Sequence, residues 1–236
     1  MSTENPEAPA PPEPAREGPQ LPWEGKARRV DLLCWGGITF SGIYALALLP
    51  LVPSLVGTNP VLLELLRGST TAMVSAGAFA RVGDASLVLA LLAPFPIMLL
   101  FDPLYWWAGR LWGRPIIDIF AGNRPRAQRW VDKIERNAPK IGPPAVVFAY
   151  ELPIPSALVY AAVGWTGMRL RIFILLDLIG TAMWVGLNVG LGYIIGQSAV
   201  DVAKAISRYA LILTIVLVVV VVVLQFRRSS RPPNPL

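Results

Sequence analysis

The sequence predicts an all-α integral membrane protein with about four full spans and two re-entrant helical hairpins. Of its 236 residues, 54% are hydrophobic and only 15% are charged, whereas a soluble domain carries about 25% charged residues. The mean hydropathy is +0.54. Several apolar blocks are long enough to cross the hydrocarbon core as helices, which takes about 20 residues. Two further apolar blocks contain prolines and charged residues, and these predict the hairpins.

The first 29 residues are rich in proline, glutamate and alanine and poor in large apolar residues. Such a segment cannot bury enough surface to offset its ordering entropy, so we expect a disordered cytoplasmic tail. A signal peptide is not expected, because Lys26, Arg28 and Arg29 come after this stretch and directly precede an apolar span. That span is expected at residues 32–56, within a membrane domain covering residues 30–226.

A broken apolar segment, residues 58–83, follows the first span. It contains an Asn-Pro pair, Glu64, Arg67 and a Gly-Ser-Thr-Thr cluster. A charge at the bilayer centre costs at least about 2.5 kcal/mol, so a short helix that enters the membrane and returns fits better than a span. Glu64 and Arg67 are three residues apart, which allows either a mutually neutralising pair on one helix or a site for a substrate or a proton.

A second full span is expected at residues 85–107, where it ends in an aromatic belt typical of a headgroup interface. The polar loop that follows, residues 110–140, carries eight basic residues. Trp130 and Ile134 lie among these charges, which favours an amphipathic helix on the membrane surface.

Residues 141–164 are apolar but contain four prolines, which makes a straight span implausible and predicts a second re-entrant hairpin. Glu151 lies in its middle. A carboxylate at membrane depth is expensive and by default functional, so Glu151 is the sharpest candidate for a proton or cation site. The alternative places it at the interface, solvated or paired with Lys140.

Two continuous spans are expected at residues 172–195 and 209–226, followed by a short cytoplasmic tail, residues 227–236. Asp177 lies about five residues into the first of them. It is a candidate proton-relay group, and an ion pair with Arg110 or Arg171 near the interface is the alternative.

The placement of basic residues sets the expected orientation. With four spans and two returning hairpins, 17 of the 21 lysine and arginine residues fall on the face that holds both termini. The positive-inside rule makes that face cytoplasmic, as expected for a multi-pass protein of a bacterial plasma membrane. Broken segments also lie at matching positions of the two halves, which is the best sequence indication of a transporter binding site.

Several function classes are excluded by composition. The chain has no histidine and a single cysteine, Cys34, so we expect no disulfide, no metal site, no cofactor and no histidine-based catalysis. The formal charge of +6 does not indicate nucleic-acid binding, because the basic residues lie between apolar spans.

Three segments resemble one known family. The run DPLYWWAGRLWG at residues 102–113 is similar to its signature, and Pro153 with Gly164 is similar to its second re-entrant loop. The segment at residues 173–196 is similar to its penultimate span. In this order they resemble the DedA family of the SNARE-associated (VTT) superfamily over about residues 45–226. The positions that match its pattern are Asp102, Tyr105, Gly109, Arg110, Pro153, Gly164, Gly180 and Gly192.

The resemblance implies two facing re-entrant hairpins within a helical bundle. It also implies movement of a lipid, either a phospholipid or a polyprenyl-phosphate carrier, between leaflets, with proton coupling in some members. We expect Asp102 to form a hydrogen-bonded clasp with Tyr105 and Arg110, and the glycines to allow close helix approach. Membrane lipids are the expected partners, and a homo-oligomer is left open.

The second hairpin departs from the family pattern. Tyr150 and Ser156 stand where two arginines are usual, so a substrate phosphate would lack its bidentate partners. Two interpretations follow. In the first, the chain is a non-enzymatic lipid transporter whose groove is lined by Glu151, Glu64 and Arg67, with Asp177 as a proton relay. In the second, it is a membrane scaffold or partner-binding protein that keeps the fold without transport.

Overall fold

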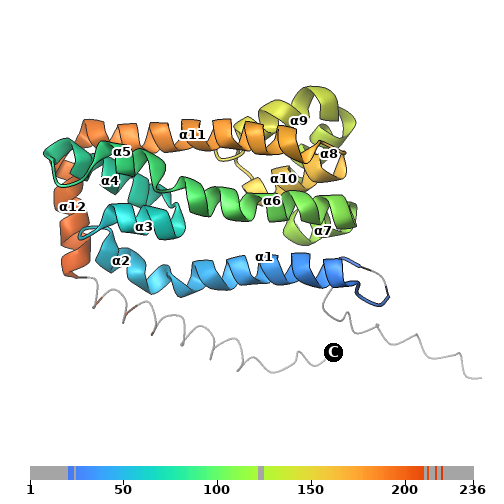
Figure 1. The fold of residues 1–236 in the computed structure, drawn as a ribbon, viewed down its shortest axis with the longest axis horizontal. Helices are drawn as coiled ribbons and strands as arrows, with labels where there is room; N and C mark the ends of the chain where they lie inside the picture. The colour runs from blue at the N-terminus through green and yellow to red at the C-terminus, as the bar shows by residue number, and fades with distance from the viewer. Residues whose placement is uncertain are drawn as a thin grey trace, which may run out of the picture.

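A computed structural model describes residues 21–209, apart from 24 and 122–124, together with residues 212, 216 and 219. These residues form helices and no strand (Figure 1). Three helical stretches are long and apolar enough to cross a membrane, at Arg29–Leu55, Leu87–Trp112 and Leu170–Ile195. The predicted all-α membrane class is therefore confirmed. The fourth predicted span and both predicted tails lie wholly or largely outside the described residues.

The first span consists of α1 (Arg29–Ala47), a 3₁₀ turn (Leu49–Leu51) and α2 (Val52–Leu55). The break coincides with Pro50, which cannot continue an α-helical hydrogen-bond ladder. Just before α1, within the expected tail, the Trp23 ring lies 5.9 Å from Trp35 and 5.7 Å from Trp112. An aromatic cluster therefore anchors the start of the first span.

The first hairpin is formed by α3 (Pro60–Arg67) and α4 (Thr70–Val82). The Asn59 side chain caps α3 by accepting a hydrogen bond from the Leu62 amide at 3.1 Å. Gly68 ends α3 with a φ of +58°, a left-handed conformation that favours glycine. The broken segment thus folds as two short helices joined by a tight turn.

The second span consists of α5 (Leu87–Leu92) and α6 (Phe95–Trp112), and two shorter helices follow, α7 (Arg114–Ala121) and α8 (Pro125–Arg136). The predicted amphipathic helix corresponds to α8. Its apolar side chains Ala127, Val131 and Ile134 are buried at helical spacing. They belong to the core that contains the second hairpin, so this face packs on protein and not on lipid.

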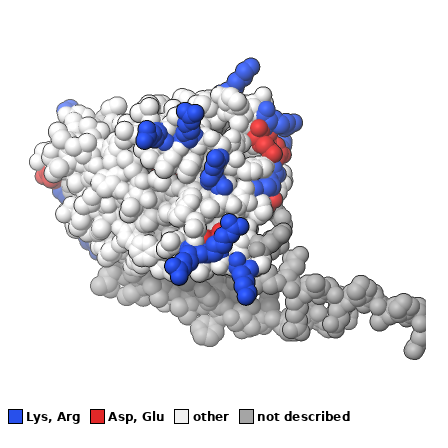
Figure 2. Space-filling model, turned by 45° about the vertical axis from the view of Figure 1, so that its right-hand side comes forward, with Lys and Arg blue, Asp and Glu red and all other residues white. Residues whose placement is uncertain are grey.

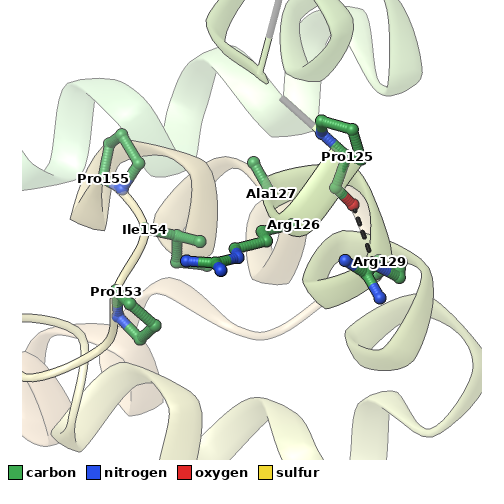
Figure 3. Close-up of a pocket in the computed structure, with 7 residues that line it drawn as sticks. All are labelled: Pro125, Arg126, Ala127, Arg129, Pro153, Ile154 and Pro155. Carbon is green, nitrogen blue, oxygen red and sulfur yellow. Dashed lines mark hydrogen bonds between the residues drawn. The ribbon is translucent and has the colours of Figure 1, made fainter. Parts of the chain in front are cut away.

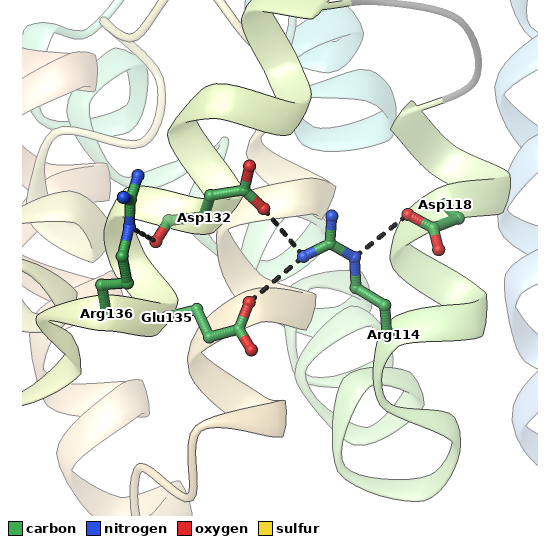
Figure 4. Close-up of polar contacts among 5 residues, drawn as sticks. All are labelled: Arg114, Asp118, Asp132, Glu135 and Arg136. Atoms are coloured by element: carbon green, nitrogen blue, oxygen red, sulfur yellow. Dashed lines mark hydrogen bonds and ion pairs between the residues drawn. The ribbon is translucent and has the colours of Figure 1, made fainter.

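Arg114 at the start of α7 connects the two short helices (Figure 4). Its guanidinium donates to Asp118 at 3.2 Å, to Asp132 at 2.8 Å and to Glu135 at 3.1 Å. The hydrogen bond to Asp132, followed by the contacts with Asp118, raises the pKa of Arg114. One arginine therefore neutralises the acidic side of α8.

The second hairpin consists of α9 (Ala138–Val147), a connection at residues 148–155, and α10 (Ser156–Trp165). The last described span, α11 (Leu170–Ile195), then runs the length of the bundle. At its end Gly196 takes a φ of +61° and the chain turns into α12 (Gln197–Arg208), which crosses one end of the bundle (Figure 1). This helix is not among the elements predicted from the sequence.

Glycines let each inner hairpin helix cross a span at backbone contact. A Cβ at Gly109 of α6 would collide with the Ala161 carbonyl of α10, and a Cβ at Gly164 would collide with the Trp106 carbonyl. The α4–α11 crossing is built in the same way, with Gly77 against the Val189 carbonyl and Gly192 against that of Val74. Gly180 likewise abuts the Val147 carbonyl. These glycines therefore serve close helix approach.

Basic side chains gather at the end of the bundle that carries α7, α8 and α9, which Figure 2 turns toward the viewer. The opposite end carries Arg81, Lys204 and Arg208, and there Lys204 pairs with Asp84 at 3.2 Å. The charge asymmetry seen in the sequence is thus an asymmetry between two ends of the folded molecule.

Candidate functional site

A cavity of about 240 Å³ lies where the tips of the two hairpins approach each other. Its walls come from four elements: α1, the α3–α4 turn, α6 and the tip of the second hairpin. Apolar side chains line it together with hydroxyls, a guanidinium and a carboxylate. The lining residues used below are Ser41, Tyr44, Arg67, Phe101, Asp102, Tyr105 and Tyr150.

The first hairpin brings Arg67 to this cavity, and α1 holds it there. Arg67 Nη1 donates to the Ala45 carbonyl at 2.8 Å, and the Tyr44 hydroxyl donates to the Leu66 carbonyl at 2.8 Å. These two bonds fasten the tip of α3 to α1. A guanidinium has five N–H donors, so Arg67 keeps donors for an anion in the cavity.

Asp102 is the carboxylate of the cavity, and its partner comes from the second hairpin. The Tyr150 hydroxyl donates to Asp102 Oδ2 at 2.7 Å, and Asp102 is only 8% exposed. The expected clasp is not formed, because the Tyr105 hydroxyl lies 3.3 Å from the Ser41 hydroxyl and Arg110 is exposed. Asp102 therefore connects the second span to the hairpin tip.

Aromatic rings fix Tyr150 in this position. Its ring stacks on Trp184 of α11 with centroids 6.1 Å apart, and it meets Tyr160 of α10 edge-on at 6.5 Å. Tyr160 in turn packs edge-on against Phe173 at 5.2 Å. Tyr150 is thus held as a rigid neutral donor.

A second layer of buried polar groups lies on α10 and α11. Asp177 is 1% exposed, and Tyr160 and Thr181 are fully buried. Neither carboxylate oxygen of Asp177 nor either hydroxyl has a hydrogen-bond partner among the described residues. The alternative that Asp177 pairs with Arg110 or Arg171 is not supported, since no such ion pair occurs in the described part of the chain. Buried polar groups are normally satisfied by protein or ordered water.

The two candidate glutamates lie outside the cavity. Glu64 is fully buried and its carboxylate oxygens have no partner within the described ranges, so the expected Glu64–Arg67 pair is not formed. Glu151 is exposed on the second hairpin. It forms no ion pair with Lys140 among the residues described. The structure therefore places Arg67 and Asp102 in the lining of one cavity, whereas Glu64, Glu151 and Asp177 do not line it. Asp177 nevertheless lies close enough to Asp102 for their charges to interact.

Sequence reasoning missed Tyr44 and Tyr150 as site residues. Tyr150 did carry a signal, because the resemblance implies an arginine at its position, but this difference indicates only a lost charge and not a new hydrogen-bond donor. Tyr44 carried no signal of a functional role, since an aromatic residue within an apolar span is usually a packing residue.

The cavity can hold the polar part of an amphipathic molecule, because its lining combines one guanidinium, one carboxylate and several hydroxyls with apolar side chains. Within the described ranges, no group of three or more histidine, cysteine, aspartate or glutamate side chains is placed to hold a metal ion.

Comparison with known protein families gives one match: the model of the VTT domain matches residues 68–194, more than half of the chain. No curated protein and no solved structure matches the chain in the corresponding comparisons. The matched range begins at the turn of the first hairpin and ends within α11, so it contains most of the cavity and both glycine crossings. The chain therefore belongs to the VTT-domain family, also called the DedA or SNARE-associated family.

Proposed function

We propose that this protein is a non-enzymatic transporter that moves a phosphate-bearing lipid between the leaflets of a plasma membrane, with both termini cytoplasmic. The observation that carries the proposal is the cavity between the hairpin tips, which combines the Arg67 guanidinium with an apolar wall. Membership in the VTT-domain family supports membrane transport in general. The basic end of the bundle supports the orientation.

The physical argument rests on the cost of moving a headgroup through hydrocarbon. A charged phosphate needs polar partners along its path, and a guanidinium provides two parallel donors that match its oxygens. The acyl chains need no such path, since they can remain in the lipid. The cavity supplies a guanidinium, hydroxyls and apolar side chains for these two requirements. Its one carboxylate, Asp102, accepts a hydrogen bond from the Tyr150 hydroxyl, and a bound phosphate would have to be held on the Arg67 side of it.

The buried layer behind the cavity supports proton coupling as part of the proposal. Asp177 is a carboxylate inside a span with no hydrogen-bond partner among the described residues, and because such groups are expensive they usually mark an ion or proton pathway. Tyr150 donates to Asp102 and meets the Tyr160 ring edge-on, and Tyr160 in turn lies close to Asp177.

The test is leaflet exchange of fluorescent phospholipid and polyprenyl-phosphate analogues in proteoliposomes. Arg67→Gln should slow exchange about tenfold or more, since a charge-assisted hydrogen bond contributes about 1.5–3 kcal/mol. Arg81→Gln is the matched control, because Arg81 is exposed at the end of α4 and lies over the Tyr193 ring, away from the cavity. Wild-type rates no faster than in empty liposomes, with folded protein, would refute the proposal.

Glu151→Gln tests whether the transport site is the cavity near Arg67 or lies around Glu151 on the second hairpin. The cavity proposal expects exchange in this variant to remain near wild type, because Glu151 does not line the cavity. Loss of exchange in Glu151→Gln together with normal exchange in Arg67→Gln would move the site to the exposed side of the second hairpin.

A scaffold function is the second candidate, and one observation favours it. Tyr150 satisfies Asp102 with a neutral hydroxyl at a position where the family has a cation, so the cavity holds less positive charge than the family pattern provides. A scaffold would show no exchange with any analogue and no stabilisation by any lipid phosphate.

A further inference from the structure

A second hollow, of about 420 Å³, lies outside the cavity between α8 and the end of the second-hairpin connection. On one side stand Arg126 and Arg129 of α8, and on the other the Pro153–Pro155 segment (Figure 3). Arg126 extends across the hollow toward Pro153 and Ile154. A volume in this range suits a ligand of headgroup size or somewhat larger.

The arginines are presented by the geometry of α8. Arg126, Arg129 and Lys133 recur at helical spacing on one side of the helix, and its apolar face is buried. Arg129 Nε donates to the Pro125 carbonyl at 3.2 Å, which fixes the direction of its guanidinium. Lys133 lies over the Trp130 ring at 5.2 Å. The same face forms an adjoining hollow of about 260 Å³ lined by Arg126, Arg129, Trp130 and Lys133.

The charge of this face is not neutralised within the described part of the protein. The two acidic residues of α8, Asp132 and Glu135, both pair with Arg114 on another side of the helix (Figure 4). No ion pair to Arg126, Arg129 or Lys133 occurs among the residues described. Two arginines therefore line a hollow whose other lining residues are apolar and include three prolines, and Lys133 lines the adjoining hollow.

We infer that this hollow binds a phosphate-bearing anion, held by Arg126 and Arg129 with Lys133 at its edge. Guanidinium groups are suited to phosphate because their planar donors bind two oxygens at once. The phosphate has two possible sources, the headgroup of an anionic lipid in the adjacent leaflet or a free phosphate compound. The site lies apart from the Arg67 cavity and does not depend on the transport proposal, since it shares no lining residue with that cavity.

The experiment measures binding and not transport, by calorimetric titration of the purified full chain in a neutral detergent. The probes are short-chain phosphatidic acid, phosphatidylcholine of the same chain length, and glycerol phosphate. Wild type should bind phosphatidic acid saturably and more tightly than phosphatidylcholine. Glycerol phosphate assigns the source: binding as tight as the lipid indicates a free phosphate ligand, and much weaker binding indicates a lipid headgroup.

Two charge-matched double variants make the test specific to the hollow. Arg126→Gln with Arg129→Gln should weaken phosphatidic acid binding about tenfold or more, since two charge-assisted contacts are lost. Arg136→Gln with Lys140→Gln removes the same charge from the same end of the molecule but touches neither hollow, and should weaken binding less than about threefold. All four residues are exposed, so both variants should fold. Equal weakening in the two variants, or no saturable binding by wild type, would overturn the inference.

Discussion

The crossing of α4 and α11 gives the sharpest stability prediction, because one methyl group tests it. A Cβ at Gly192 would lie 2.7 Å from the Val74 carbonyl carbon and closer still to its oxygen, whereas carbon atoms reach optimal contact at about 3.5–4.0 Å. The obstacle is helix backbone, so Gly192→Ala must push the two helices apart by on the order of 1 Å. A gap of that size removes about a quarter to a half of the van der Waals attraction of each affected atom pair. We expect a loss of about 1–3 kcal/mol, the usual cost of overpacking.

The same helix supplies the control. Gly186 is exposed and a Cβ there meets nothing within 4 Å. Because alanine is favoured over glycine within a helix by about 1 kcal/mol, Gly186→Ala should leave stability unchanged or raise it. The two substitutions are chemically identical and lie six residues apart, yet we expect them to change the free energy of unfolding in opposite directions.

The assay is thermal unfolding in detergent, followed by tryptophan fluorescence. For a chain of this size about 1 kcal/mol corresponds to a shift of roughly 2–4 °C, so Gly192→Ala should lower the midpoint by roughly 2–12 °C. If both variants unfold at the same temperature, the backbone contact at the crossing does not determine stability and the packing argument fails.

Three further predictions follow from the polar contacts. Tyr150→Phe leaves the buried Asp102 without its 2.7 Å donor, so the free energy of unfolding should fall by about 1–3 kcal/mol and lipid exchange should slow. If the thermal midpoint and the exchange rate both stay at the wild-type values, the hydrogen bond contributes nothing. Asp177→Asn removes a buried carboxylate that has no hydrogen-bond partner among the described residues, at nearly constant side-chain volume. The thermal midpoint should therefore stay the same or rise, and any dependence of lipid exchange on a pH gradient should disappear. If that dependence persists, the proton path lies elsewhere. Arg114→Gln removes three ion pairs whose partners are about half exposed. The free energy of unfolding should therefore fall by about 1 kcal/mol at low salt and by less at high salt. A loss of stability that does not change with salt would contradict an electrostatic origin.

The spans and hairpins could be predicted because their signals are local. A proline or a charge within an apolar block has the same cost wherever the rest of the chain lies, so the segment containing Glu64 and Arg67 indicated two short helices without any knowledge of its neighbours. The amphipathic helix α8 was visible for the same reason, since its buried positions repeat at helical spacing.

Side-chain partners could not be predicted, because they join distant parts of the chain. Asp102 was assigned partners from its own helix, yet its donor is Tyr150, 48 residues away. Glu151 and Tyr150 are neighbours in an irregular connection, and sequence gives no rule for which of them faces inward. The helix α12 was missed although its sequence is amphipathic at helical spacing, with Val200 and Ala203 buried on its apolar side. It lies between two long apolar blocks, and the stretch between them was treated only as a connection.

The glycine crossings described above also constrain how this protein can move. Each pairs a hairpin helix with a span at one point where both backbones are in contact, so a side chain on either helix would strike its partner if the helices slid along each other. These two pairs are also the most extensively packed helix pairs in the described part of the chain. The α6–α10 and α4–α11 pairs should therefore each behave as one rigid unit. A change in the space around Arg67 would then come from movement of one unit against the other and would not require either hairpin helix to slide along its span.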